Sequence, residues 1–172
     1  MTEFSFRIEN VSDIREDLHE RIRQIPYYSD NFSPILEITP IGLGNRETQE
    51  LLSNTKLDSN EKMILCKTRY IGIYDLRTSL DQYKSKHPKL FDRYLKKCCY
   101  DLLNSANLLQ EANINDIELT EEVIICRDVD GKPIIEIKES KEKMTLSVKK
   151  RIMNLLMAIV TIPTEMESIF EE

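Results

Sequence analysis

The sequence predicts an α+β domain in which a small antiparallel sheet packs with several helices. Two β-rich runs, Glu122–Cys126 and Pro133–Lys138, flank a polar stretch containing Asp130-Gly131, a pair that tolerates the positive φ angles of tight turns. A long amphipathic segment precedes this hairpin and another follows it. Apolar and polar residues also alternate from Phe4 to Glu9, with the period of a half-buried strand.

Length and composition fit one folded unit. The chain has 172 residues, of which 41% are hydrophobic, enough for a core of its own. We expect a single domain over residues 1–172. Residues 1–74 would supply the sheet and one helix, and residues 75–172 would be mainly helical with a short hairpin at 122–138.

Net charge, apolar runs and cysteine spacing limit which partners and which cellular compartment we expect. The formal net charge is −6, so neither nucleic acid nor an anionic membrane is an expected partner. No run approaches the ~18 apolar residues of a transmembrane helix, and no signal peptide is visible, so we expect an intracellular, cytoplasmic protein. No CxxC spacing occurs, which favours reduced core thiols over a metal site and predicts no cofactor. The cysteines are Cys66, Cys98, Cys99 and Cys126.

The N-terminal part predicts a strand, a helix and two further strands. The strand covers residues 4–9, and the helix covers 11–25, where isoleucines and a leucine share one face and Pro26 ends the run. Strands are expected at 35–41 and within 63–74. The intervening residues 45–62 predict a hairpin loop with one helical turn near 47–52.

The C-terminal part predicts three helices around the hairpin. A short helix is expected to start over 75–83 and to end in a turn at 84–88, and the strongest helix covers 89–110. The last helix, capped by Thr145 or Ser147, runs to Ile162. Its second half, 153–162, is apolar on nearly every side, which predicts burial on all sides. Residues 165–172 form one more turn or a frayed end.

Catalytic motifs are scarce. The chain has four glycines and neither GxGxxG nor GxxxxGK[ST], so Gly42-Leu43-Gly44 is interpreted as a turn. His19 and His87 are both expected at the surface, where they would support no catalytic triad. Asp128 and Asp130 are interpreted as solvated turn carboxylates, because the other ligands of a calcium loop are missing.

The order of these elements resembles most of a protein kinase fold. Residues 4–9 resemble the lysine-bearing strand, residues 11–25 resemble helix C, and residues 34–43 and 63–71 resemble the two strands that follow. Residues 72–80 resemble the hinge with the start of helix D, and residues 89–110 resemble helix E. Residues 123–126 with 133–137 resemble the small hairpin, and residues 145–162 resemble helix F. On this resemblance Asp116 lines up with the catalytic aspartate, and Arg7 is the only basic residue on the first strand that could replace the ATP lysine.

The residues that carry kinase chemistry are replaced at most of these positions. Ile114 and Asn115 stand where kinases have His and Arg, and Glu118 reverses the charge of the phosphate-contacting lysine. Glu136-Ile137-Lys138 stands in place of the magnesium-binding Asp-Phe-Gly. Phosphoryl transfer depends on cancelling phosphate charge, so the resemblance implies no kinase activity and no catalytic residue.

The leading hypothesis is a non-catalytic, kinase-like interaction or structural subunit. Its partner would be another protein or a second copy, covering the last helix at Ile152, Leu155, Leu156 and Ile159. One alternative is a small carboxylate- or metal-dependent enzyme using Asp116, Glu118 and Glu136. Another is an α+β binding adaptor unrelated to kinases, favoured if the hairpin does not pack between the two long helices.

Overall fold

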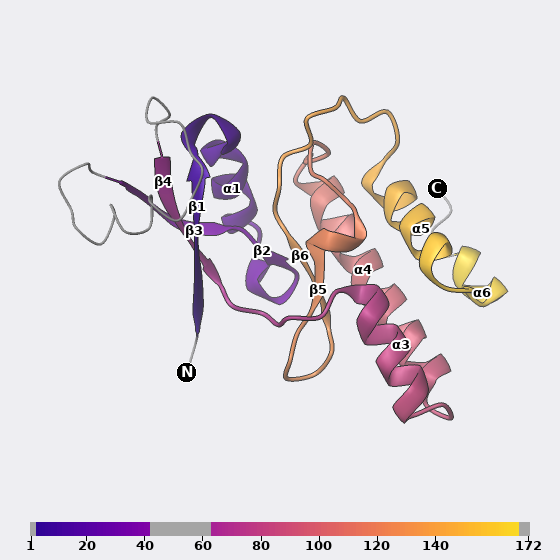
Figure 1. Ribbon diagram of the computed structural model, residues 1–172. Helices are drawn as coiled ribbons and strands as arrows, with labels where there is room; N and C mark the ends of the chain where they lie inside the picture. The colour runs from indigo at the N-terminus through magenta and orange to yellow at the C-terminus, as the bar shows by residue number, and fades with distance from the viewer. Residues whose placement is uncertain (1–2, 42–62, 169–172) are drawn as a thin grey trace.

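The computed structural model describes residues 3–41 and 63–168, and within them the predicted α+β class is confirmed (Figure 1). Two three-stranded sheets and five α-helices make up the described part of the chain. No helix in residues 3–41 and 63–168 is long and apolar enough to cross a membrane. The loop predicted at 45–62, its helical turn at 47–52 and the turn at Gly42–Gly44 lie outside the described residues.

The first sheet has the strand order β1-β4-β3 and is antiparallel throughout. Its strands are β1 (Phe4–Asn10), β4 (Met63–Arg69) and β3 (Ile35–Pro40), close to the predicted bounds. One face covers a small core of Ile35, Ile64 and Cys66, and Ile14, just before the helix α1 (Glu16–Arg23), packs against this core.

The second sheet contains the predicted hairpin. Strands β5 (Ile124–Cys126) and β6 (Pro133–Glu136) pair antiparallel, and β2 (Phe32–Ser33) adds to β6 in parallel. Gly131 has φ +71°, as the turn prediction requires, and Tyr94 Oη donates to its carbonyl at 2.9 Å. Because β2 comes from the N-terminal part and β6 from the C-terminal part, this sheet joins the two.

The helices of the C-terminal part surround the main core. They are α3 (Leu76–Lys86), α4 (Phe91–Glu111), α5 (Val148–Ile159) and α6 (Thr164–Glu167). The long helix α4 packs against α3, α5 and β6, which places it at the centre of this part of the fold. All four cysteines are buried and free, which confirms the prediction of core thiols.

Three predicted helix boundaries are wrong. Residues 11–25 do not form one helix, because Val11–Asp13 is a separate 3₁₀ turn, capped by the Asn10 side chain, and Ile14 is extended. Helix α3 continues through Lys86, where a turn was expected. Helix α5 starts after the predicted Ser147 cap but ends at Ile159, because Val160 has an extended backbone.

The chain by itself does not bury the second half of the last helix on every side. Ile152 and Leu156 are fully buried, Leu155 and Ile159 are half-buried, and Met157 is 51% exposed. The helix is therefore amphipathic in its packing, with one stripe in the core and an apolar outer side in contact with solvent.

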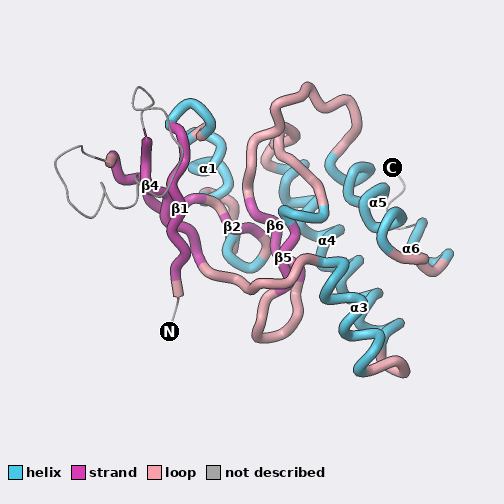
Figure 2. The backbone as a smooth tube through the Cα atoms, in the orientation of Figure 1, coloured by secondary structure: helices cyan, strands magenta, loops and turns pink. Residues whose placement is uncertain are grey.

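The linker between β4 and α3 follows the end of the hairpin closely (Figure 2). The carbonyl of Tyr74 accepts from the Cys126 amide at 3.0 Å, and the carbonyl of Ile71 accepts from the Asp128 amide at 3.2 Å. A Cβ at Gly72 would lie 2.5 Å from the Cys126 carbonyl oxygen, so only glycine lets the linker approach β5 this closely.

We expect Gly72→Ala to lower the free energy of unfolding by about 1–3 kcal/mol, because the new methyl group must push the linker away from a rigid backbone oxygen. Urea denaturation followed by circular dichroism measures this change. Ile73→Ala is the matched control, since Ile73 in the same linker is 70% exposed and its truncation should cost little. Equal costs for the two substitutions would contradict the close approach at Gly72.

Candidate functional site

Asp116, the position that resembles a catalytic aspartate, lies in the segment after α4. Its side chain is 62% exposed, and its Oδ2 lies 3.7 Å from Nη1 of Arg15. The same guanidinium nitrogen lies 3.5 Å from Oε1 of Glu139. Nε of Arg15 also lies 3.2 Å from Oδ1 of Asp17, so one cation of the chain itself faces three carboxylates at this point.

Glu118 is engaged in the same way by a cation from beyond β6. Nζ of Lys138 lies 3.6 Å from its Oε2, and the Glu118 amide donates to the Lys138 carbonyl at 2.8 Å. The Ser140 amide donates to the Asp116 carbonyl at 3.0 Å, and Ile117 forms an isolated antiparallel β-bridge with Glu139. These backbone bonds hold residues 116–118 beside residues 138–140.

Glu136 differs from the other two acidic positions because it is half-buried at the end of β6. Burial raises the pKa of its carboxyl, and the positive charges of Arg7 and Lys138 oppose that rise. Glu136 lines a cavity of about 400 Å³ that Arg7, Arg15 and His19 also line. Asp116 and Glu118 are not among the lining residues, so the three predicted carboxylates do not share this cavity. Across residues 3–41 and 63–168, no group of three or more histidine, cysteine or acidic side chains could hold a metal ion.

His19 is buried, which corrects the expectation that it lies at the surface. Its Nδ1 accepts a hydrogen bond from the Ile35 amide at 2.9 Å, and Arg23 donates to the Ile35 carbonyl. Burial, reinforced by the nearby charges of Arg7 and Arg23, lowers the pKa of His19 to about 4. The imidazole is therefore a neutral acceptor that joins α1 to β3, whereas His87 is exposed as predicted.

Arg151 on α5 is a structural residue at this site that the sequence reasoning missed. Its guanidinium donates to the Ile117 carbonyl at 2.7 Å and to both the carbonyl and the Oδ1 of Asn115. Burial lowers its pKa, and Asp116 opposes that shift. Arg151 thus fixes the segment that carries Asp116 to helix α5.

Asn31, just before β2, is a second buried polar residue that the sequence did not reveal. Its Oδ1 accepts from Oγ of Ser105 at 3.2 Å and from Nδ2 of Asn104 at 3.4 Å. Its carbonyl accepts from the Ile135 amide at 3.0 Å. Asn31 therefore ties the N-terminal part to α4 and β6 at once.

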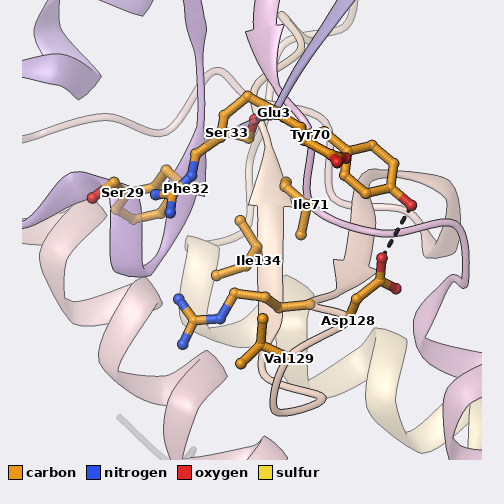
Figure 3. A pocket seen from close by; sticks show the side chains of 11 residues that line it. Glu3, Ser29, Phe32, Ser33, Tyr70, Ile71, Asp128, Val129 and Ile134 are labelled. Carbon is orange, nitrogen blue, oxygen red and sulfur yellow. Dashed lines mark hydrogen bonds between the residues drawn. The ribbon is translucent and has the colours of Figure 1, made fainter. Parts of the chain in front are cut away.

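A second cavity, of about 270 Å³, opens beside the linker (Figure 3). Its apolar wall is made by Phe32, Ile71 and Ile134, and Tyr70 Oη donates to Asp128 Oδ2 at 3.0 Å on its rim.

The neighbouring Arg127 also lines this cavity and is held by its own turn. Its Nε donates to Asp130 Oδ1 at 2.9 Å, and this pairing lowers the pKa of Asp130 to about 2. Asp130 thus accepts from donors of its own turn, and Asp128 accepts from Tyr70 of the linker, which agrees with their interpretation as turn residues.

No protein-family model matches this sequence, and no curated protein matches it.

Proposed function

We propose that the chain is a non-catalytic interaction or structural subunit, built on a partial kinase-like arrangement. The observation that carries the proposal is the pairing of Asp116 with Arg15 and of Glu118 with Lys138. A phosphoryl-transfer site needs its acidic groups free for metal and substrate. In this chain, these carboxylates are paired with cations of the chain itself.

The apolar surface supports an interaction role, and the distribution of burial on α5 says which residues are available. Ile152 and Leu156 belong to the core, so of the four predicted contact residues Leu155 and Ile159, which are half-buried, can meet a partner, together with the exposed Met157. The expected partner is a protein or a second copy, in the cytoplasm of the cell, and the net charge of −6 disfavours nucleic acid.

We expect no transfer of labelled phosphate from ATP and no saturable thermal shift with Mg²⁺ and ATP, measured with the whole chain. Asp116→Asn is the control, and it should behave like the unsubstituted chain in both assays. A magnesium-dependent shift that saturates with ATP and disappears in Asp116→Asn would refute the proposal.

One observation favours each alternative. The half-buried Glu136, with its raised pKa, beside a cavity is what a carboxylate-dependent enzyme would need. A metal-dependent melting shift lost in Glu136→Gln would support that alternative. The unrelated adaptor is favoured by the packing of the hairpin, whose strands contact α3 and α4, whereas α5 packs against α4.

A further inference from the structure

We propose that β1 pairs antiparallel with β1 of a second copy of this chain, so that two three-stranded sheets join into one six-stranded sheet. The inference goes beyond the proposed function, because it assigns a second surface, the edge of β1, separate from α5, and names its occupant. Within residues 3–41 and 63–168, β1 pairs with β4 alone, which leaves its other side as a sheet edge.

The backbone groups on that edge can be assigned from one hydrogen bond. The Tyr70 amide donates to the Glu3 carbonyl at 2.9 Å, so Glu3 directs its backbone groups toward β4. In an antiparallel pair, successive residues alternate in this direction. The amides and carbonyls of Phe4, Phe6 and Ile8 therefore face the open side, where another strand would bond.

The two edges of this sheet are unequal. The outer strand β3 carries a register shift between Ile35 and Glu37 and ends at Pro40, both of which hinder the addition of a strand. The strand β1 keeps an unbroken register with β4 over all seven of its residues and contains no proline. A regular edge with exposed apolar side chains is where a further strand adds.

The side chains of β1 also expose apolar surface on one face. Arg7 lies opposite the buried Cys66, so its neighbours Phe6 and Ile8 point to the face away from α1. Phe4 is 43% exposed and Phe6 is 61% exposed, and Nζ of Lys67 lies 4.1 Å from the centre of the Phe4 ring. A second β1 would place its own aromatic rings against Phe4 and Phe6.

The sequence of β1 is complementary to itself in the register that also pairs its two phenylalanines, Phe4 and Phe6. With the two-fold axis at Ser5, Phe4 faces Phe6 of the second copy, and Glu3 faces its Arg7. Aromatic pairs and opposite charges are the favourable cross-strand pairs. Moving the axis to Phe6 places Glu3 opposite Glu9, and moving it to Arg7 places two arginines opposite each other. The Ser5 register thus avoids the like charges of these two.

The first test measures the mass of the full chain in solution by light scattering and sedimentation over a wide concentration range. We expect a dimer, and we expect Phe6→Pro to give a monomer whose circular dichroism spectrum is nearly unchanged. Proline removes an amide that faces the edge and spares the bonds to β4. Phe6→Thr keeps the amide and should dissociate less than Phe6→Pro.

Charge reversal tests the register. Glu3→Arg and Arg7→Glu should each weaken the dimer about tenfold, because each places like charges opposite one another twice. An equal mixture of the two variants should associate again, since each charge then meets its opposite. Failure of the mixture to associate would overturn the register and the proposal with it.

Cross-linking locates the axis. Ser5→Cys should form a disulfide between copies under mild oxidation, because residues facing each other at such a position have Cα atoms about 4.5 Å apart. Glu37→Cys on β3 is the matched control and should not form a disulfide between copies. A monomer at every concentration, or a dimer that survives Phe6→Pro and both charge reversals, overturns the inference. Neither result alters the phosphate-transfer assay that tests the proposed function.

Discussion

Replacing Ile152 with alanine is expected to lower the free energy of unfolding by about 2–5 kcal/mol, because the side chain is fully buried where α5 packs against α4. Val148 and Leu156 are buried on the same stripe of α5, one turn away on either side. Truncation would leave a cavity that these rigid neighbours cannot fill. Chemical denaturation, with the dependence on denaturant compared between variants, measures the loss.

Met157→Ala is the matched control on the same helix. Met157 is half exposed, so its truncation should change the free energy of unfolding by only about 0.5 kcal/mol. Comparable losses at residues 152 and 157 would mean that α5 is covered on both sides in solution. That result would restore the sequence-based expectation of burial on every side, with a partner or second copy as the cover.

The elements that were predicted well are those whose signal is local. The alternation in β1 and the Asp130-Gly131 pair each determine a backbone conformation within a few residues, and both were found. Of the two predicted caps, Thr145 and Ser147, the helix has Ser147, whose side chain accepts from the Lys150 amide. The side of α5 that reaches solvent was missed, since hydrophobicity alone does not say how many neighbours a helix has.

The candidate site was only partly predictable. Asp116 and Glu118 were placed by their order along the chain, but the basic side chains that pair with them or hold their segment come from distant elements. Arg15 lies just before α1 and Arg151 lies on α5, and neither has a local sequence signal. Such pairs depend on tertiary packing, which spacing alone does not reveal.

His19 gave a signal that was misinterpreted. It lies between Leu18 and Ile22, both buried on α1, and therefore on the border of the apolar stripe. A histidine there can be kept in the core if it accepts a backbone hydrogen bond, as it does from Ile35. The choice between surface and core depends on whether such a donor is present, and that donor is on another element.

We expect the buried His19 to make the fold acid-sensitive. Its pKa falls from 6.5 to about 4 in the folded chain, so the neutral form is favoured by folding. This stabilisation is fully present above pH 6.5 and is lost as the pH falls from 6.5 towards 4. The loss in the free energy of unfolding is about 3 kcal/mol at most. Denaturation curves recorded at successive pH values measure this loss.

Two substitutions separate the titration of His19 from its hydrogen bond. His19→Asn keeps an acceptor for the Ile35 amide but cannot be protonated, so its stability should lose this dependence on pH. His19→Leu leaves the amide without a partner and should cost about 1–3 kcal/mol at neutral pH, and its stability should also lose this dependence on pH. Glu136 faces the same cavity, and its raised pKa has the opposite effect, because acid stabilises a buried carboxyl. The difference between the unsubstituted chain and His19→Asn removes that contribution, and a difference that does not change with pH would show that His19 is not buried as a neutral acceptor.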